Sequence, residues 1–430
     1  MQRIQASKDR RFLCHSDDSS FFWLGDTAWE IFHRLRREEA DEYLSARAQQ
    51  GFTVIQGVAL AEFDGIDEPN AYGDRPLKKN ASGAYDPTLP DTDGAYWEYV
   101  DWVLERAAHY GLYVALLPTW GDKFNLQWGV GPELFTPRNA RAYGKWIGAR
   151  YASRDNVVWM LGGDRPLVTE EHHLIIRAMA EGIKDGGATQ LMTFHPVGGK
   201  SSSDFVQDEA WLDMHSFQSG HGEGWHNSWR MVAHDRALLP VRPVINAEPR
   251  YEDHPAYFDA ASGHVYDEHD ARLHIWWDCL SGAAGHTYGN HCIWSMNAEI
   301  TPYFRYLWRE ALWHPGAQQM RIAKETLQRY VPARVPFDEL LIDQGDTTSH
   351  LAACRDGSVA LCYSPLGLPF RVRLSAMQGD AVRASLICPR TGKIETLGLF
   401  PLEDCTFAPP TQGRGADWTL LLEEYSREKK

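Results

Sequence analysis

Short apolar runs recur along the chain up to about residue 335, and segments with helical periodicity separate most of them. Runs of this kind are typical of strands that helices cover on both faces. We expect eight strands, at residues 21–29, 52–60, 112–120, 156–164, 190–197, 213–218, 243–248 and 285–288. We expect helices at residues 36–50, 96–110, 139–151 and 170–184. Strands that alternate with helices predict parallel pairing with right-handed crossovers, and eight such units predict an α/β fold, the (β/α)8 TIM barrel.

The pattern changes after about residue 335. Short alternating runs follow at residues 340–342, 358–363, 370–374, 382–387 and 418–422, with turn signals such as Arg355-Asp356-Gly357 between them. Alternation with regular turns is typical of antiparallel strands. We therefore expect two domains: a catalytic barrel over residues 1–335 and a small antiparallel β-sandwich over residues 336–430. The long polar segment 61–93 follows the second strand, so we expect it to lie over the catalytic face.

Two of the predicted strands end in a carboxylate. Asp164 follows Gly162-Gly163 and precedes Arg165, while Glu248 is followed by Arg250. The carboxyl ends of barrel strands form the rim of the active site. Two carboxylates on this rim are what hydrolysis of a glycosidic bond requires.

The positions of the two acids suggest their roles. Asp164 ends the fourth strand and Glu248 the seventh, which by analogy with retaining glycosidase barrels makes Asp164 the acid/base and Glu248 the nucleophile. A neighbouring cation lowers the pKa of a carboxyl. Arg250 therefore suits a nucleophile at Glu248, whereas Arg165 suits an acid at Asp164 only if its side chain points away. In the alternative interpretation, each acid pairs with its arginine and merely closes the barrel top.

Other polar and aromatic residues near the strand ends are candidates for binding a substrate. Trp120 could stack on a sugar ring, and Lys123 could donate to a hydroxyl group. Asp26 could bind sugar hydroxyls or could equally cap the following helix. The 17 tryptophans could alternatively serve as core filler. The full set of candidates is Asp26, Trp29, Gln56, Trp120, Asp122, Lys123, Arg165, His195, His215, Gln218, Asn246, Arg250 and Tyr288.

Charge and motif content argue against several other classes of function. The net charge of −15, without a long basic run, disfavours nucleic acid as a partner. No GxGxxG follows a first strand and no GxSxG occurs, so we expect neither a nucleotide cofactor nor a serine nucleophile. His215, His221 and His226 lack the compact spacing of a metal site. We therefore expect neither a metal nor a cofactor.

The cysteines and the N-terminal residues bear on location. The seven cysteines have no CxxC spacing and are typical of free, mostly buried thiols in a reducing compartment. We expect no membrane span, because no stretch of 18 apolar residues occurs. The first residues lack the apolar segment of a signal peptide, which favours the cytoplasm unless an export signal has been trimmed. The oligomeric state stays open.

Five ordered motifs resemble one enzyme family. They lie at residues 22–29, 51–56, 117–123, 161–166 and 246–249, and they resemble glycoside hydrolase family 140 over roughly residues 5 to 330. The tail resembles the β-sandwich, named for collagen binding, that often follows this catalytic domain. The resemblance implies a barrel with Asp164 and Glu248 as the catalytic pair, and apiosidase activity on apiose-containing side chains of pectin. Because members of this family are usually exported, the lack of a leader here favours a short, imported oligosaccharide.

These observations together predict a retaining, exo-acting glycosidase. Its substrate would be a plant-derived oligosaccharide with an apiofuranosyl or other pentofuranosyl linkage. Two alternatives stay open: a carbohydrate-binding barrel without catalysis, and a transglycosidase that uses the same pair of carboxylates with a sugar as acceptor.

Overall fold

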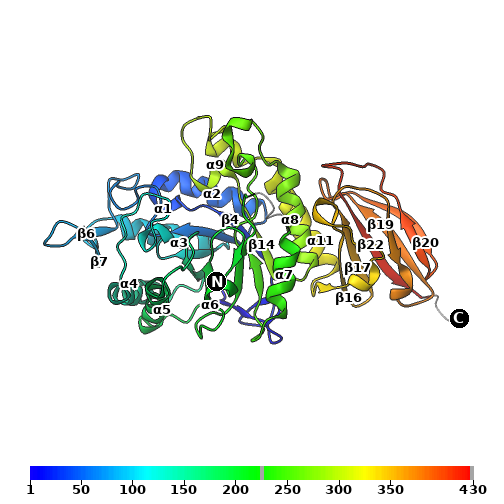
Figure 1. The fold of residues 1–430 in the computed structure, drawn as a ribbon, viewed down its shortest axis with the longest axis horizontal. Helices are drawn as coiled ribbons and strands as arrows, with labels where there is room; N and C mark the ends of the chain where they lie inside the picture. The colour runs from blue at the N-terminus through cyan, green and yellow to red at the C-terminus, as the bar shows by residue number, and fades with distance from the viewer. Residues whose placement is uncertain (223–226, 427–430) are drawn as a thin grey trace.

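The computed structural model describes residues 1–222 and 227–426. A helix-covered barrel and a smaller all-β domain lie side by side, with helices α8 (Glu268–Leu280) and α11 (Pro315–Tyr330) between them (Figure 1). Within the described ranges, none of the helices has the length and apolarity needed to cross a membrane.

Eight parallel strands form the barrel, and each predicted apolar run contains one of them. They are β4 (Trp23–Thr27), β5 (Val54–Val58), β8 (Tyr113–Leu117), β9 (Val157–Gly162), β10 (Met192–His195), β12 (His215–Gln218), β13 (Val244–Asn246) and β14 (Gly285–Tyr288). Parallel pairing runs from β12 through β13, β14, β4, β5, β8 and β9 to β10. Hydrogen bonds from Asp213 N to Met192 O (2.9 Å) and from Thr193 Oγ1 to Met214 O (2.8 Å) bring β10 beside β12. The predicted TIM barrel is confirmed.

The four predicted helices are also present. They are α2 (Arg37–Gln49), α3 (Tyr96–His109), α4 (Pro137–Tyr151) and α5 (Glu170–Asp185). Thr136 and Thr169 cap α4 and α5 by accepting a backbone N–H, as residues at this position commonly do. The remaining α-helices of the described barrel are α1 (Ile31–Arg34), α6 (Ser203–Val206), α7 (Ser228–Ala237), α9 (His291–Trp294) and α10 (Trp308–Ala311).

The apolar core of the barrel has two layers. One cluster lies between the strands and the surrounding helices, and a second, which includes Val158, Met160 and Ile245, fills the interior of the barrel. A small N-terminal sheet, β1 (Ile4–Ala6), β2 (Leu13–His15) and β3 (Ser20–Phe21), adds apolar side chains to the inner cluster. This sheet, which the sequence did not predict, packs at the end of the barrel opposite the rim.

The long segment after the second strand is not a bare loop. It contains a hairpin formed by β6 (Leu77–Lys79) and β7 (Tyr85–Pro90), which extends away from the barrel at the far end from the C-terminal domain (Figure 1). A two-residue strand, β11 (Lys200–Ser201), pairs antiparallel with β12 at the edge of the barrel sheet.

The C-terminal domain is antiparallel. Its main sheet has the order β15 (Val335–Pro336), β16 (Ala352–Asp356), β17 (Val359–Ser364), β22 (Trp418–Tyr425), β19 (Ala381–Ile387) and β20 (Ile394–Phe400). A second sheet of β18 (Phe370–Arg373) and β21 (Asp404–Phe407) shares its apolar core. The predicted strand at residues 340–342 is wrong, because Asp338–Leu340 form a 3-10 turn and Leu341 makes only a single bridge. Leu340 lies in the core of this domain, so its apolar side chain reflects burial and does not require a strand.

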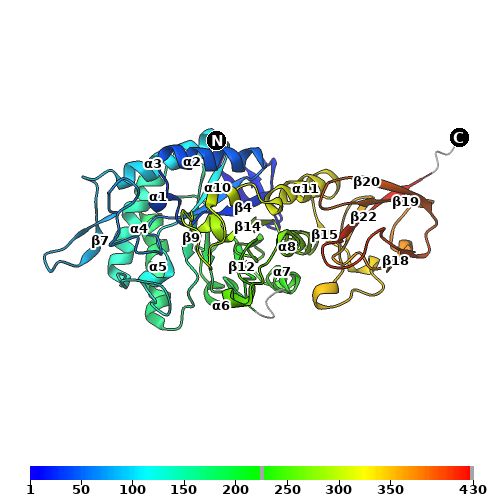
Figure 2. The ribbon, with the colours of Figure 1, turned by 90° about the horizontal axis from the view of Figure 1, so that it is seen from above.

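Aromatic contacts join the two domains along α8. Trp276 stacks on Tyr363 with ring centroids 5.6 Å apart, and the indole N–H of Trp277 donates to the carbonyl of His350 at 2.9 Å. Figure 2, seen from above, shows α8 and α11 against the strands of the C-terminal domain. The seven cysteines are all free, and six of them are buried.

Candidate active site

A left-handed turn places Asp164 at the rim of the barrel. Gly162, Gly163 and Asp164 have φ angles of 91°, 116° and 53° in succession. A Cβ at Gly162 would lie 2.5 Å from the carbonyl of His195, and one at Gly163 would lie 2.7 Å from the amide of Gly121. Only glycine fits such positions, while aspartate is among the few other residues that tolerate a left-handed conformation. The Gly-Gly-Asp sequence is therefore what turns this carboxylate into the cavity.

Both predicted catalytic carboxylates line one cavity of about 430 Å³, which lies where the barrel strands end. This volume is in the range of small-molecule sites. Its walls combine aromatic rings with few polar groups, a composition suited to the apolar faces of a sugar. The lining residues are Trp29, Glu62, Trp120, Trp128, Asp164, Val197, Gly198, Gln218, His221, Glu248, Tyr251, His254, Phe258, Trp294 and Tyr303.

Two histidines flank the Glu248 carboxylate. Nε2 of His221 lies 3.1 Å from Oε1, and Nε2 of His195 lies 3.1 Å from Oε2. The other ring nitrogen of each histidine accepts a backbone N–H, from Tyr251 at 3.5 Å and from Asp164 at 3.3 Å. A ring nitrogen that accepts a backbone N–H carries no proton, so in each ring Nε2 is the nitrogen that faces Glu248 as a donor site. Nε2 of His221 therefore donates to Glu248, whereas Nε2 of His195 lies at ion-pair distance from the other carboxylate oxygen without a hydrogen-bond geometry.

These contacts keep Glu248 ionised. Burial favours the neutral acid, but the interactions with His195 and His221 outweigh it and lower the pKa of Glu248 to about 2. Donors that contact the charged form stabilise that form. The prediction that Arg250 lies beside Glu248 is wrong: its guanidinium packs 4.5 Å above the ring of Tyr266. Histidines from other strand ends take the place expected for the arginine.

Asp164 has the opposite electrostatic setting. Burial and repulsion from Glu248 raise the pKa of Asp164 to about 6, although Arg165 and His195 oppose this shift. Arg165 does not point away as a general acid was expected to require, since its Nη1 lies 3.3 Å from Oδ2 of Asp164. The indole N–H of Trp128 also donates to Oδ2, at 3.1 Å. Two carboxylates whose pKa values are pushed apart in this way can act as acid and nucleophile.

A third carboxylate, Glu62, lies beside Arg165. Nη2 of Arg165 is 3.5 Å from Oε1 of Glu62, and the guanidinium stacks 4.2 Å above the ring of Trp128. Burial raises the pKa of Glu62 to about 8 despite Arg165. The sequence interpretation missed Glu62, although it follows the second strand directly and so could have been found by the same strand-end rule as Asp164.

Several other predicted contacts are at the site. Trp29, Trp120 and Gln218 line the cavity with the two acids. The ring of Trp29 packs 5.1 Å from that of Trp120 and 5.3 Å from that of His195, which joins these three residues into an aromatic floor. Besides Glu62, the sequence interpretation missed Trp128 and Tyr251 as lining residues, because they lie in segments that follow strands; His221, which was considered as a rim residue beside the sixth strand, does line the cavity.

The structure does not bring Asp26, Asp122 or Lys123 to the cavity, which corrects their expected role. Asp26 is fully buried and pairs with Nε of Arg47 from α2 at 2.6 Å. Asp122 and Lys123 pair with each other at 2.8 Å, and neither side chain is exposed. Asp26 does not cap α1 or α2 either. These charges are neutralised inside the protein and are not directed at a ligand.

Five further predicted contacts are also corrected, because their side chains are buried against the protein and do not line the cavity. The amide nitrogens of Gln56 and Asn246 donate to Ala247 O and Asp278 Oδ2, and the hydroxyl of Tyr288 donates to Glu252. His215 contacts the hydroxyl of Ser202 at 3.1 Å. The set is Gln56, His215, Asn246, Arg250 and Tyr288. Asn246 and Tyr288 do end β13 and β14, whereas Gln56 lies in the middle of β5 and His215 begins β12.

Only two of the three histidines considered for a metal site lie within the described residues. His215 and His221 are described, whereas His226 lies outside the described residues. Over residues 1–222 and 227–426, there is no group of three or more His, Cys, Asp or Glu side chains that could hold a metal ion.

Comparisons with known families cover almost the whole chain. A family described as "Apiosidase-like, catalytic domain" matches residues 7–332, and one described as "Putative collagen-binding domain of a collagenase" matches residues 335–423. No curated protein matches the chain.

Solved structures resemble the chain over both domains. A protein described as a glycoside hydrolase has a TM-score of 0.87 and 27% identity, with 99% of this chain and 98% of that chain covered. A glycoside hydrolase family 5 protein from Bacteroides vulgatus has a TM-score of 0.86 and 26% identity, with coverage of 99% and 94%. An α-amylase from Geobacillus thermoleovorans, with a TM-score of 0.57, 11% identity and coverage of 95% and 99%, shares the fold.

Proposed function

Because the chain belongs to the apiosidase-like family and is a glycosidase, we propose that it is a retaining, exo-acting enzyme of glycoside hydrolase family 140. Its substrate is a short plant-derived oligosaccharide with a terminal pentofuranosyl group, in the first instance an apiofuranosyl group. The choice of apiose is supported by the family match, and the choice of a short chain by the size of the cavity.

The observation that carries the proposal is the divergence of the two carboxylates. At pH values between about 2 and 6, Glu248 is ionised and Asp164 is protonated. This is the combination that a retaining glycosidase needs in its first step, since one residue attacks and the other donates a proton.

The reaction then has two steps. A Glu248 oxygen attacks the anomeric carbon while the bond to the leaving oxygen breaks, and the Asp164 proton moves to that oxygen. In the second step Asp164, now ionised, takes a proton from water, whose oxygen attacks the anomeric carbon and releases Glu248. His195 contacts Glu248 through Nε2 and accepts the Asp164 N–H through Nδ1, so it fixes the two acids relative to each other.

The cavity also favours an uncharged glycone. Glu62, Asp164 and Glu248 all line it, and among the described lining residues none is a lysine or an arginine. A substrate carboxylate at this position would be repelled by Glu248, whereas sugar hydroxyls would meet oxygens and indole N–H groups that can pair with them. A neutral pentofuranosyl group at the acids agrees with this electrostatic setting.

The test is a panel of aryl pentofuranosides, aryl pyranosides and pectin-derived oligosaccharides, with the released sugar followed by NMR. We expect the wild type to release a pentose whose first-formed anomer has the configuration of the substrate. The variant Glu248→Gln should release none, while Glu105→Gln, which changes an exposed glutamate on α3, serves as the matched control. Inversion of configuration would overturn the nucleophile role, and transfer to added methanol would measure transglycosylation.

A further inference from the structure

We propose that the C-terminal domain helps to build the active site, with its Arg414 acting as a positioning residue that fixes His221 against Glu248. This inference rests on the proposed function, because it gives a supporting role to residues around the proposed nucleophile. It goes beyond that function in assigning the second domain a part in catalysis and not only in stability.

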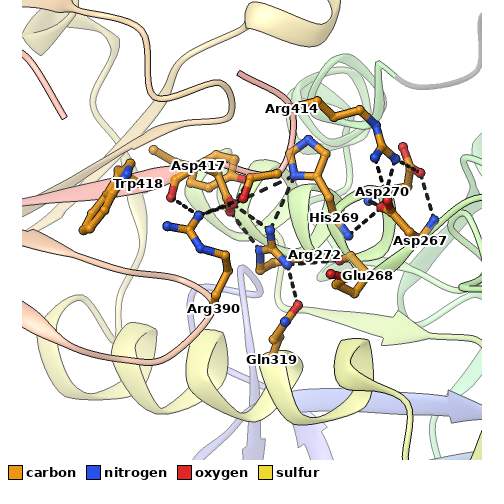
Figure 3. A network of polar contacts seen from close by, with 12 residues as sticks. Asp267, Glu268, His269, Asp270, Arg272, Gln319, Arg390, Arg414, Asp417 and Trp418 are labelled. Atoms are coloured by element: carbon orange, nitrogen blue, oxygen red, sulfur yellow. Dashed lines mark hydrogen bonds and ion pairs between the residues drawn. The ribbon is translucent and has the colours of Figure 1, made fainter. Parts of the chain in front are cut away.

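The first step is the contact of Arg414 with the start of α8. Its Nη1 lies 2.5 Å from Oδ2 of Asp267, and its Nη2 lies 2.9 Å from Oδ1 of Asp267 and 2.6 Å from Oδ2 of Asp270 (Figure 3). The two aspartates form the capping box of α8, in which each accepts a backbone N–H of the other's segment. Arg414 therefore neutralises two neighbouring acids and joins them.

The second step leads from the helix start towards the cavity. Oδ1 of Asp270 lies 4.0 Å from Nη1 of Arg250, and the Arg250 guanidinium packs 4.5 Å above the ring of Tyr266. Arg250 and Tyr266 are only 6% and 4% exposed. The cation of Arg250, two residues beyond the nucleophile, is thus held between an acid at the domain boundary and an aromatic ring.

The third step reaches the histidine. The hydroxyl of Tyr266 donates to the carbonyl of His221 at 2.8 Å, and the backbone N–H of Tyr266 donates to the carbonyl of His254 at 2.9 Å. The rings of His254 and His221 are stacked, with centroids 4.1 Å apart and planes 13° apart. Tyr266 therefore holds His221 both by its backbone and through the ring that lies against it.

Another ion pair joins α8 to the C-terminal domain, this time with the cation on the helix and the acid on the domain. Arg272, one turn into α8, donates to both carboxylate oxygens of Asp417, at 2.9 and 2.6 Å. Figure 3 shows this pair beside the Arg414 contacts. The helix start thus receives a cation from the C-terminal domain, and the following turn supplies one to it, which fixes α8 in both position and rotation.

A second ion pair between the domains provides the matched control. Arg230 on α7 lies 2.9 Å from Asp346, and both side chains are largely exposed. This pair joins the same two domains. Among the described interactions, however, neither Arg230 nor Asp346 contacts Asp270, Arg250 or Tyr266. Breaking the Arg230–Asp346 pair therefore tests whether the loss of any ion pair between the domains is enough to displace His221.

The experiment compares Tyr266→Phe, Arg414→Gln and Arg230→Gln in the full chain by kcat/KM as a function of pH. If His221 is displaced, it donates less well to Glu248, whose pKa rises, so the acidic limb of the profile moves to higher pH. None of the three variants substitutes another titratable group that faces His221 or Glu248. Those groups are Asp164, His195, Tyr251, His254 and His291. We expect Tyr266→Phe to lower kcat/KM roughly threefold to tenfold, the equivalent of one hydrogen bond, and Arg414→Gln about twofold to fivefold.

A second readout does not require turnover. In protein labelled with 15N-histidine, the ring signals of His221, assigned by their loss in His221→Gln, should shift in Tyr266→Phe and Arg414→Gln and stay in place in Arg230→Gln. If Arg414→Gln lowers the melting temperature but leaves these signals and the acidic limb as in Arg230→Gln, the positioning role is wrong. If the signals shift as expected but no glycoside is cleaved by the wild type, the proposed function fails and the contact between the domains stands.

Discussion

Two buried clusters, one in the cavity and one between the domains, contain the same kinds of residue in different electrostatic settings. Between the domains, Asp417 receives two hydrogen bonds from Arg272, one from Arg390 at 2.9 Å and one from the hydroxyl of Tyr363 at 2.9 Å. Burial alone would raise the pKa of Asp417, but these partners lower it. In the cavity, Asp164 is also largely surrounded by protein, yet its pKa rises to about 6.

The difference lies in how the charge is compensated. Asp417 faces two guanidinium groups, whereas Asp164 has one arginine, which it shares with Glu62, and a second carboxylate that repels its charge. A buried carboxylate with matched cations supports the fold, and one with unmatched charge is ready to take up or release a proton. Burial and residue type are similar in the two clusters, so compensation is what separates the structural acid from the reactive one.

The largest effect should follow from Glu248→Gln. The amide cannot form a glycosyl-enzyme, so we expect kcat on aryl glycosides to fall on the order of 10⁴-fold. The unfolding temperature at pH 7 should also fall, because the lowered pKa of Glu248 means that its charge stabilises the fold, so activity is compared well below that temperature. Residual activity above a tenth of that of Glu105→Gln would remove Glu248 from the mechanism.

Asp164→Asn should have the next largest effect, and one that depends on the leaving group. Loss of a general acid costs about 10²-fold to 10⁴-fold, but a phenol of low pKa leaves without a proton, so the loss should shrink on such substrates. In the wild type, kcat/KM should fall as the pH rises through about 6, where Asp164 loses its proton. Equal losses on good and poor leaving groups would contradict this role.

Asp164→Asn should also change the unfolding temperature, in a way that depends on pH. The folded protein holds the Asp164 proton more tightly than the unfolded chain does, since its pKa is raised from 3.8 to about 6. Ionised Asp164 therefore destabilises the fold increasingly as the pH rises from about 4 to 6, and fully above that window. Asp164→Asn should unfold at a higher temperature than the wild type at pH 7 and at the same temperature near pH 3, as measured by calorimetry.

Asp417→Ala should show the reverse combination, with a large loss of stability and a loss of kcat/KM no larger than that of Arg414→Gln. Removing one partner of a buried ion pair costs about 3–5 kcal/mol, because the other charge stays buried, and Arg272 would be left in that state. Chemical denaturation at pH 7 measures the loss. The double variant Asp417→Leu with Arg272→Met should recover much of it, and failure to do so would show that Arg272 is not the group that makes the single change costly.

The sequence could predict the barrel and the two acids because both are encoded locally. Apolar runs mark most of the eight strands, although β12 and β14 contain more polar residues, and Gly162-Gly163 mark the turn that directs Asp164. The N-terminal sheet and the edge strand β20 escaped notice because the former is made of strands of two or three residues and the latter is mostly exposed. A short or exposed strand leaves little trace in the alternation of apolar and polar positions.

The partners of the acids could not be predicted, because they are set by packing between distant segments. Arg250 is two residues from Glu248 in sequence but contacts Tyr266, whereas His221 is 27 residues away and contacts the carboxylate. Asp26 looked available at its strand end, but Arg47 from α2 pairs with it. Neighbours along the chain are poor guides to neighbours in space once side chains leave the rim in different directions.

The smallest effect should come from Glu62→Gln. This variant decides whether the third carboxylate is a structural acid, like Asp417, or a reactive one, like Asp164. With a pKa of about 8, Glu62 is neutral throughout the range in which Asp164 is protonated, so glutamine imitates its working state. We expect kcat/KM to stay within about twofold of the wild type below pH 7, with differences only above about pH 8, where the charge on Glu62 appears. A tenfold loss at pH 5 would show instead that the carboxyl group donates its proton to the substrate or to Asp164. That result would make Glu62 a third reactive acid, whereas the expected one makes it a neutral partner of Arg165.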